Sequence, residues 1–282
     1  MKPGPILSLF PGIGLLDRAF ESLGMTVVRG PDLLWGGDIR KFHPGGGWAW
    51  GVMGGSPCQD FSAARRDPPT GNGLAMIDEF TRVVRDARPE WWLLENVPRV
   101  PDIAIAGYTW QRIDVELSWY SATRRLRHFQ FGSWSWVEIE IPRGVPDYAA
   151  DSAALASHGS LEETIAKQGL PSDFCLPGFT RDGARRAIGN GVPIPMGTAV
   201  ASAIATAYGL RSVIRDEPGE SRTGPVADRP DSPFTRKCEC GCGRKFESRK
   251  RRFASDACRK RANRRARRVT DHAALPRSSI PT

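Results

Sequence analysis

Two residues with reactive side chains each follow an apolar run in the sequence. Cys58 comes after the glycine-rich residues 51–55 and a proline, where an exposed thiol would be positioned for nucleophilic attack. Glu95 comes after the apolar residues 91–94, and a carboxyl group in such a partly apolar site has a raised pKa. Structural roles are the alternatives, because a lone cysteine is often a small buried residue and a carboxylate can cap a helix.

A glycine-rich turn near the N-terminus offers a place for a nucleotide-like cofactor. The turn is Phe10-Pro11-Gly12-Ile13-Gly14, and Asp17 stands where a dinucleotide fingerprint has its third glycine. NAD binding is therefore disfavoured. S-adenosylmethionine has no pyrophosphate and needs backbone room only for its amino-acid half, so this turn suits it. A plain structural turn is the alternative.

Strand and helix patterns alternate around these motifs. Apolar, strand-like runs occupy residues 5–10, 25–29, 51–54 and 91–94. Helical patterns occupy residues 15–23, 75–87, 161–168 and 196–210. The alternation predicts an α/β fold with a mostly parallel sheet and helices on both faces. Because sites in such sheets lie at the carboxyl ends of strands, we expect Gly12, Cys58 and Glu95 to meet at one edge.

Two further patterns follow in the second half of the chain. Aromatic side chains alternate along residues 129–136 and predict another strand, with Trp134 and Trp136 in the core beside Trp91 and Trp92. Ser160 and Glu163 have the spacing of an N-cap and its partner at the start of the helix at 161–168.

Composition narrows the class of protein. The chain has 282 residues, enough for one large domain or a large and a small one. No apolar run approaches the roughly 18 residues of a membrane span, and the N-terminus lacks signal-peptide features. Six cysteines are too few for a disulfide scaffold. We therefore expect a cytoplasmic protein without membrane contact.

The positive charge is concentrated near the C-terminus. The chain has 40 Lys and Arg against 31 Asp and Glu. Residues 236–268 hold 15 of the Lys and Arg residues and 3 of the Asp and Glu residues. The other 249 residues hold 25 Lys and Arg and 28 Asp and Glu, so the rest of the chain is close to neutral. Such a dense cationic segment suits phosphate binding, with a solvated disordered tail as the alternative.

Taken together, six motifs over about residues 5–210 resemble the DNA cytosine-5 methyltransferase family in order and spacing. They are Leu7-Ser8-Leu9-Phe10-Pro11-Gly12-Ile13-Gly14, Gly37-Asp38-Ile39, Ser56-Pro57-Cys58-Gln59-Asp60-Phe61-Ser62, Glu95-Asn96-Val97, Arg125-Leu126-Arg127 and Gly189-Asn190-Gly191-Val192-Pro193. The resemblance implies the Rossmann-like fold of S-adenosylmethionine-dependent methyltransferases.

The resemblance also implies a mechanism. Cys58 would attack C6 of a flipped-out cytosine, because C5 alone is a poor nucleophile and is inaccessible inside a duplex. Glu95 would hydrogen-bond the N3 and amino edge of the base, and Arg125 or Arg127 would hold the base carbonyl or the carboxylate. After methyl transfer, loss of the C5 proton would release Cys58.

The cofactor pocket implied by the resemblance draws on several segments. Its expected residues are Phe10, Gly12, Ile13, Gly14, Asp32, Asp38, Ile39, Pro57, Asn190 and Val192. Asp32 is the candidate for the ribose-binding acidic residue, which is a Glu in most members, and Thr123 replaces the glutamine that commonly precedes the arginine pair.

The region that reads the DNA sequence is short in this chain. Residues 161–171 resemble the family's ninth motif, which leaves residues 142–157 for a truncated target-recognition region. The catalytic domain would comprise residues 1–141 and 158–212, followed by a linker at 213–235. Sequence specificity would be low or supplied by the tail or a partner protein. We expect a monomer that binds double-stranded DNA.

A basic zinc module is expected at residues 236–268, followed by a disordered tail at 269–282. Four thiolates, enough for one tetrahedral zinc ion, come from Cys238, Cys240, Cys242 and Cys258. Reduced, unligated thiols are the alternative. The following residues resemble zinc ribbons that end in a basic helix, which would track DNA phosphates.

Two other functions stay open at this stage. One is a catalytically silent DNA-binding protein that keeps the methyltransferase fold, which the intact catalytic set disfavours. The other is an RNA cytosine-5 methyltransferase. For a DNA methyltransferase, the sequence leaves open a role in restriction and modification, an orphan role or phage protection.

Overall fold

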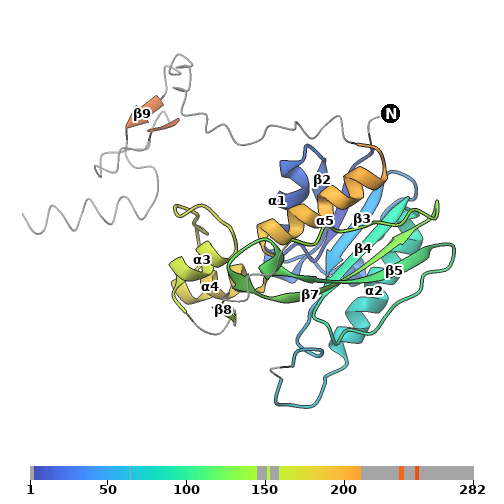
Figure 1. Cartoon of the computed structure of the whole chain (residues 1–282), viewed down its shortest axis with the longest axis horizontal. Coiled ribbons are helices and arrows are strands. Elements are labelled where there is room, and N and C mark those ends of the chain that lie inside the picture. The colour runs from blue at the N-terminus through green and yellow to red at the C-terminus, as the bar shows by residue number, and fades with distance from the viewer. Residues whose placement is uncertain are drawn as a thin grey trace, which may run out of the picture. The chain divides into compact units, whose positions relative to one another are not determined.

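The computed structural model describes residues 3–63, 65–144, 151–152, 159–210, 235–237 and 245–247 (Figure 1). The chain divides into two units, Met1–Asp216 and Glu217–Thr282. In the second unit, β9 (Thr235–Lys237) and β10 (Lys245–Glu247) form an antiparallel pair. Some predicted parts lie outside the described residues. They are the four cysteines of the zinc module, residues 213–234 of the linker predicted at 213–235, and the C-terminal residues 269–282.

One six-stranded sheet forms the centre of the first unit. Its strands, in spatial order, are β2 (Val27–Arg29), β1 (Ile6–Leu9), β3 (Gly51–Gly55), β4 (Trp91–Asn96), β7 (Leu126–Ser133) and β5 (Thr109–Glu116). The first four strands are parallel to one another, and β7 runs antiparallel to both β4 and β5. The predicted α/β fold is therefore confirmed. Strand β5 was not predicted, because it lies at the sheet edge and exposes Trp110, Arg112 and Asp114 to solvent.

Helices cover both faces of this sheet, as predicted (Figure 1). On one face, α1 (Leu15–Ser22) and α5 (Ile194–Ala207) pack apolar side chains against Trp91 and Phe131. On the other face, α2 (Asn72–Ala87) packs against Trp92 and Leu94. The alternating direction of side chains along β4 explains how neighbouring tryptophans enter different cores. Short 3-10 turns occupy Leu33–Trp35, Ile39–Lys41 and Leu117–Trp119.

Two more helices lie beside the end of the sheet where the parallel strands finish. They are α3 (Leu161–Lys167) and α4 (Arg181–Asn190), and together with α1 they bury Leu15, Ile165 and Ile188. The predicted N-cap is confirmed, since Ser160 and Glu163 form a capping box. Helix α4 was not predicted, because its sequence is polar and includes two glycines, which are poor helix formers.

The stretch Arg181–Ala207 has the length and hydropathy of a membrane-spanning helix, contrary to the expectation from apolar runs. It comprises α4 and α5, which Gly191 and Pro193 separate, and more than half of its most apolar window is buried inside the protein. The core position of α5 accounts for its apolar sequence.

The prediction that Trp134 and Trp136 are core residues was wrong. Strand β7 ends at Ser133, so both tryptophans lie beyond it, with 56% and 78% of their surface exposed. Trp134 packs edge-on against Tyr108. Trp91 and Trp92 are fully buried, as predicted.

The predicted recognition region contacts the segment that leads into β7. Its β8 (Asp151–Ser152) pairs in parallel with β6 (Thr123–Arg124), which directly precedes Arg125 in the chain. The Tyr120 hydroxyl donates to the carbonyl of Pro142, 2.6 Å away, at the start of the region. Residues 145–150 and 153–158 lie outside the described residues.

Candidate active site

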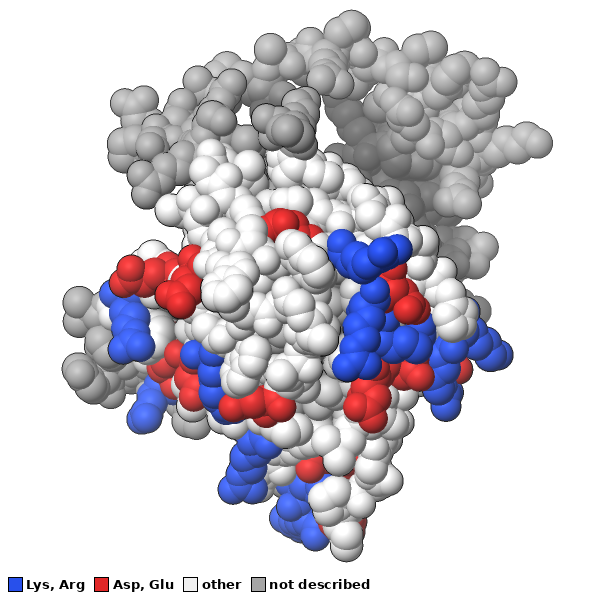
Figure 2. Space-filling view, turned by 90° about the vertical axis from the view of Figure 1, so that its right-hand side faces the viewer, with Lys and Arg blue, Asp and Glu red and all other residues white. Residues whose placement is uncertain are grey.

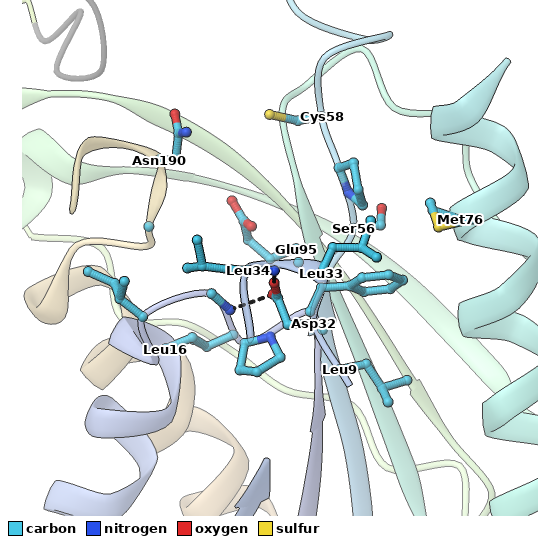
Figure 3. A pocket seen from close by; sticks show the side chains of 18 of the residues that line it. Leu9, Leu16, Asp32, Leu33, Leu34, Ser56, Cys58, Met76, Glu95 and Asn190 are labelled. Atoms are coloured by element: carbon cyan, nitrogen blue, oxygen red, sulfur yellow. Dashed lines mark hydrogen bonds between the residues drawn. The ribbon is translucent and has the colours of Figure 1, made fainter. Parts of the chain in front are cut away.

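A cavity of about 550 Å³ opens where β1, β3 and β4 end (Figure 3). Twelve of the residues predicted for catalysis or cofactor binding line it. They are Phe10, Gly12, Ile13, Asp32, Asp38, Ile39, Pro57, Cys58, Glu95, Arg127, Asn190 and Val192. Gly14 and Arg125 are outside the described lining: Gly14 is the N-cap of α1, and Arg125 lies behind the lining.

The glycine turn is held open by its backbone conformation and by Asp32. Phe10, Gly12 and Gly14 all have positive φ angles, and a side chain at Gly12 would enter open space in the cavity. Its backbone N–H donates to Asp32 Oδ2, 2.8 Å away, while the N–H of Leu34 donates to Oδ1 at 2.7 Å. The Asp32 carboxylate therefore fixes the turn against the 3-10 turn that follows β2, as Figure 3 shows.

Asp17, which replaces the third glycine of a dinucleotide fingerprint, is a buried structural residue. Its two carboxylate oxygens accept from Ser8 Oγ at 2.6 Å and from Arg29 Nε at 2.8 Å. Arg29 in turn lies beside Gly14, where an added Cβ would come within 2.9 Å of the guanidinium. The φ of 75° favours glycine at that position, whereas the flexible end of the Arg29 side chain could move aside.

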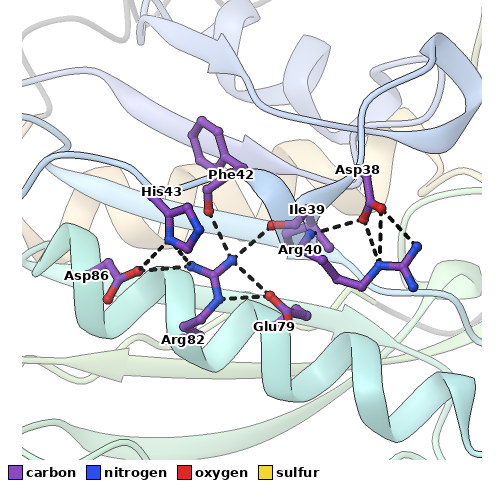
Figure 4. Close-up of polar contacts among 8 residues, drawn as sticks. All are labelled: Asp38, Ile39, Arg40, Phe42, His43, Glu79, Arg82 and Asp86. Carbon is purple, nitrogen blue, oxygen red and sulfur yellow. Dashed lines mark hydrogen bonds and ion pairs between the residues drawn. The ribbon is translucent and has the colours of Figure 1, made fainter.

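A second acidic residue, Asp38, also lines the cavity. Asp38 caps the 3-10 turn Ile39–Lys41, and Arg40 donates to it from both backbone and guanidinium (Figure 4). The hydrogen bond from the Arg40 side chain holds the pKa of Asp38 below its usual value. Arg82 of α2 fixes this segment by donating to the carbonyls of Ile39 and Phe42, each 2.9 Å away.

The loop that carries Cys58 is tied to the neighbouring strand. Asn96 Nδ2 donates to the Ser56 carbonyl at 3.1 Å and to Ser56 Oγ at 3.0 Å. Glu95 and Asn96 lie within β4, which extends two residues beyond the predicted strand. Figure 3 shows Cys58 and Glu95 on one side of the cavity and Asn190 on another.

Charge and burial perturb the titration of the catalytic candidates. Burial raises the pKa of Glu95, and Arg127, whose Nε lies 3.1 Å from Glu95 Oε1, opposes the rise. Burial, followed by the Glu95 charge, raises the pKa of the half-buried Cys58 thiol. Burial also lowers the pKa of Arg125 to about 9. The thiol therefore keeps its proton at neutral pH in this arrangement.

Arg125, which lies between β6 and β7, contacts the segment at Gly191 that lines the cavity. Its guanidinium donates to the carbonyl of Gly191, 3.2 Å away. Gln168, which is fully buried, donates to the same carbonyl at 3.1 Å and to that of Ile188 at 2.6 Å. These contacts place Val192 at the cavity wall.

Several residues at the site were not predicted from the sequence, among them Phe179 and Trp35. Phe179 lines the cavity and packs edge-on against Trp35, with ring centroids 6.0 Å apart. The indole N–H of Trp35 donates to the carbonyl of Gly12, 2.6 Å away. Neither residue lies in a motif, and their proximity depends on the tertiary fold.

Within the part of the chain that the structure describes, no group of three or more His, Cys, Asp or Glu residues could hold a metal ion. The predicted zinc ligands lie outside that part.

Residues 37–113 match the model of a family described as C-5 cytosine-specific DNA methylase. The chain is 42% identical over 63 residues to Type II methyltransferase M.HindV of Haemophilus influenzae, covering 22% of this chain and 19% of that protein. It is 30% identical over 116 residues to Type II methyltransferase M.NgoPII of Neisseria gonorrhoeae, covering 34% of each. The chain thus spans about a third or less of the length of these two relatives.

Two solved structures share the fold over most of the first unit. One is the methyltransferase EhMeth of Entamoeba histolytica, with a TM-score of 0.54 and 12% identity over 74% of this chain and 99% of that chain. The other is a prophage-encoded protein of E. coli, described as a candidate DNA modification methyltransferase, with a TM-score of 0.56 and 15% identity over 73% and 99%. At this identity the likeness shows the fold alone.

Proposed function

We propose that the chain, whose residues 37–113 match the model of the C-5 cytosine-specific DNA methylase family, transfers a methyl group from S-adenosylmethionine to C5 of cytosine in duplex DNA. One observation carries the proposal. Cys58, Glu95 and Arg127 line the same cavity as the glycine turn and its two acidic neighbours, Asp32 and Asp38.

The described cavity fits the donor in size and in its polar groups. Its volume of about 550 Å³ lies in the range of small-molecule pockets. Gly12 leaves space for backbone contact with the amino-acid half, and the apolar Leu33, Leu34 and Ile39 can flank a ring. Asp32 and Asp38 would accept from ribose hydroxyls and the adenine amino group, respectively. When bound, S-adenosylmethionine supplies an electrophilic methyl group.

The residues of this chain would activate the base as follows. The Cys58 thiolate adds to C6, which moves electron density to C5 and makes that carbon nucleophilic. Glu95 in its protonated form donates to N3, so that negative charge does not build up on the ring. Once C5 carries the methyl group, a base removes the C5 proton, the C5–C6 double bond forms again, Cys58 leaves as a thiolate, and N3 returns its proton to Glu95.

The two catalytic pKa shifts fit this sequence of events. Burial shifts the pKa of both the Cys58 thiol and the Glu95 carboxyl upward, toward the neutral forms. Arg127 pairs with the carboxylate in this arrangement. We infer that the incoming base replaces the contact between Arg127 and Glu95, and that the Cys58 thiolate forms when the target base is in place.

The half-buried position of Cys58 at the cavity also accounts for why the base must leave the duplex. C5 and C6 of a stacked cytosine are covered by neighbouring bases, so the thiol can reach C6 after the nucleotide is flipped out.

Covalent trapping tests the proposal. In the presence of S-adenosylmethionine, duplex DNA that contains 5-fluorocytosine at target sites should form a stable adduct with Cys58, because after methyl transfer fluorine cannot leave C5 as a cation and elimination stops. Mass spectrometry of the digested adduct should locate the base on the peptide that contains Cys58. Adducts formed with RNA and not with DNA would redirect the proposal to an RNA substrate.

The other expectations from the sequence stay proposals. These are a monomeric cytoplasmic enzyme, a catalytic domain interrupted by the short recognition region at 142–157, and a zinc ion held by Cys238, Cys240, Cys242 and Cys258. Elemental analysis of the purified full chain should find about one zinc per chain. A chain without zinc would contradict the last of these.

A further inference from the structure

The loop that follows Cys58 is cross-linked by one buried ion pair. Arg65 lies 2.6 Å from Asp60 Oδ1, and the two side chains are 18% and 4% exposed. The Asp60 carboxylate also accepts from the Thr70 N–H at 3.0 Å, from Thr70 Oγ1 and from the Gly73 N–H at 2.8 Å. One carboxylate therefore ties the start of the loop to its end and to the first turn of α2.

Arg65 makes the second set of cross-links. Its guanidinium donates to the carbonyls of Gln59 at 3.3 Å, Asp67 at 2.6 Å and Pro68. A guanidinium has five N–H donors in a fixed plane, so one side chain can satisfy carbonyls that have no strand or helix to bond with. Asp60 and Arg65 together form what we call the loop brace.

The brace is coupled to Cys58 through the backbone. The N–H of Phe61 donates to the Cys58 carbonyl, 3.0 Å away, which makes a tight turn between the nucleophile and Asp60. The same region packs closely on α2, since a Cβ at Gly73 would come within 2.9 Å of both Asp60 and the Phe61 ring. Movement of Asp60 would therefore shift the turn that begins at Cys58.

Neither Asp60 nor Arg65 is among the described residues that line the cavity, whereas Gln59 and Asn72, at the two ends of the loop, both line it. We propose that Asp60 and Arg65 are positioning residues that hold the Cys58 thiol at the cavity and restrict its exposure to solvent. Their effect on turnover rests on the proposed function, whereas their effect on the thiol does not.

Thiol alkylation tests the brace without reference to catalysis. Native full-length protein is treated with iodoacetamide, and peptide mass spectrometry follows Cys58, with the exposed Cys175 as an internal reference. Asp60→Ala and Arg65→Ala should each speed Cys58 alkylation about tenfold or more, since loss of the brace allows local opening, and should leave Cys175 unchanged. Asp60→Asn keeps one acceptor oxygen and should restore part of the protection.

The matched control is Arg66→Ala, which removes an exposed neighbouring arginine that takes no part in the described brace contacts. It should leave the Cys58 alkylation rate unchanged. Rates for Asp60→Ala and Arg65→Ala within about twofold of wild type would overturn the proposal. Faster alkylation of Cys175 as well as Cys58 would also overturn it, because the effect would then be general unfolding.

Kinetics separate the brace from the proposed function. With wild type active on DNA, Asp60→Ala should lower kcat about tenfold or more, while the cofactor Kd from calorimetry stays within about threefold. An unchanged kcat beside a faster Cys58 alkylation would overturn the catalytic part of the proposal. Wild-type protein without methyl transfer would count against the proposed function, and the alkylation result would still decide the role of the brace.

Discussion

Arg127 Nε lies 3.1 Å from Glu95 Oε1 at the point where β7 and β4 meet, and the two side chains are only 16% and 11% exposed. This ion pair opposes the burial that raises the pKa of Glu95. Burial and the charge of Arg127, followed by that of Arg125, therefore act in opposite directions on the pKa of the carboxyl that the proposed mechanism uses as a donor.

Replacing Arg127 should shift that balance. In Arg127→Gln the carboxylate of Glu95 loses its nearest positive charge, so its pKa should rise further and the protonated form should persist to higher pH. Titration of Glu95 by infrared difference spectroscopy checks this. Arg124→Gln, at an exposed position in β6, is the matched control and should leave the pKa of Glu95 in place. A lower pKa in Arg127→Gln would contradict the assignment.

The pH dependence of turnover should be bell-shaped. At pH values between the two raised pKa values, Cys58 and Glu95 together hold one proton. In the active form this proton is on Glu95, and Cys58 is a thiolate. Below the pKa of Glu95 the thiolate gains a proton, and above that of Cys58 the donor proton is lost, so kcat/KM should fall on both sides. The full pH profile of kcat/KM measures this.

Glu95→Gln should change the shape of that profile as well as its height. We expect a loss of about 100-fold in kcat/KM, the lower end for general acid catalysis. The acid limb should move from the pKa of Glu95 to that of Cys58, and the alkaline limb should vanish, because an amide has no titrating donor proton to lose. The rate should then rise with pH toward the pKa of Cys58, which should be lower than in wild type because the Glu95 charge no longer raises it. A wild-type acid limb in this variant would assign that limb to another group.

Asn96 should stabilise the fold through the loop that leads to Cys58. Asn96→Ala leaves the carbonyl and hydroxyl of Ser56 without their donor, which should lower the free energy of unfolding by about 1–3 kcal/mol. Urea unfolding measures the change. Ser56→Ala should lose less, because Asn96 still donates to the backbone carbonyl, and an equal loss in both variants would refute this ordering.

Trp35 should strengthen cofactor binding from outside any motif. Trp35→Phe removes the hydrogen bond to the carbonyl of Gly12 and keeps an aromatic ring near Phe179. Loss of about 1 kcal/mol would weaken the cofactor Kd about fivefold, measured by calorimetry. Trp136→Phe, an exposed tryptophan beyond β7, is the control. An unchanged Kd in Trp35→Phe would remove this residue from the site.

Deletion of residues 215–282 should flatten the salt dependence of DNA binding. On the face of the first unit shown in Figure 2, Lys and Arg lie among Asp and Glu, in keeping with a body that is close to neutral. The dense charge is at 236–268. Each DNA phosphate that the shortened chain no longer neutralises should reduce the slope of log K against log salt by about 0.9. An unchanged slope would show that other residues bind the phosphates.

The sequence predicted the parts of the fold whose signals are local. β1, β3 and β4 are buried apolar runs, and α2 has a clear amphipathic pattern, so Gly12, Cys58 and Glu95 were expected at one edge of the sheet. β5 was not predicted because exposed charged residues interrupt its apolar pattern. α4 was not predicted because its glycines and arginines are not typical of an amphipathic helix, and tertiary packing stabilises it.

Contacts between distant segments could not be predicted in this way. The pairing of Asp17 with Arg29, the contact of Trp35 with Phe179 and the bond from Gln168 to Gly191 each join residues from separate elements. No pattern along the chain signals such a contact, because it depends on how the elements pack. The segment at Asn190 and Val192 was expected at the cavity through the resemblance alone.

The most direct test of the account is transfer of labelled methyl from S-adenosylmethionine to unmethylated duplex DNA, with nucleoside mass spectrometry of the product. Wild type and Cys175→Ala should both form 5-methylcytosine, and Cys58→Ala should form none while it still binds the cofactor. Wild-type levels of product from Cys58→Ala, or no product from wild type with cofactor and DNA both bound, would contradict the account.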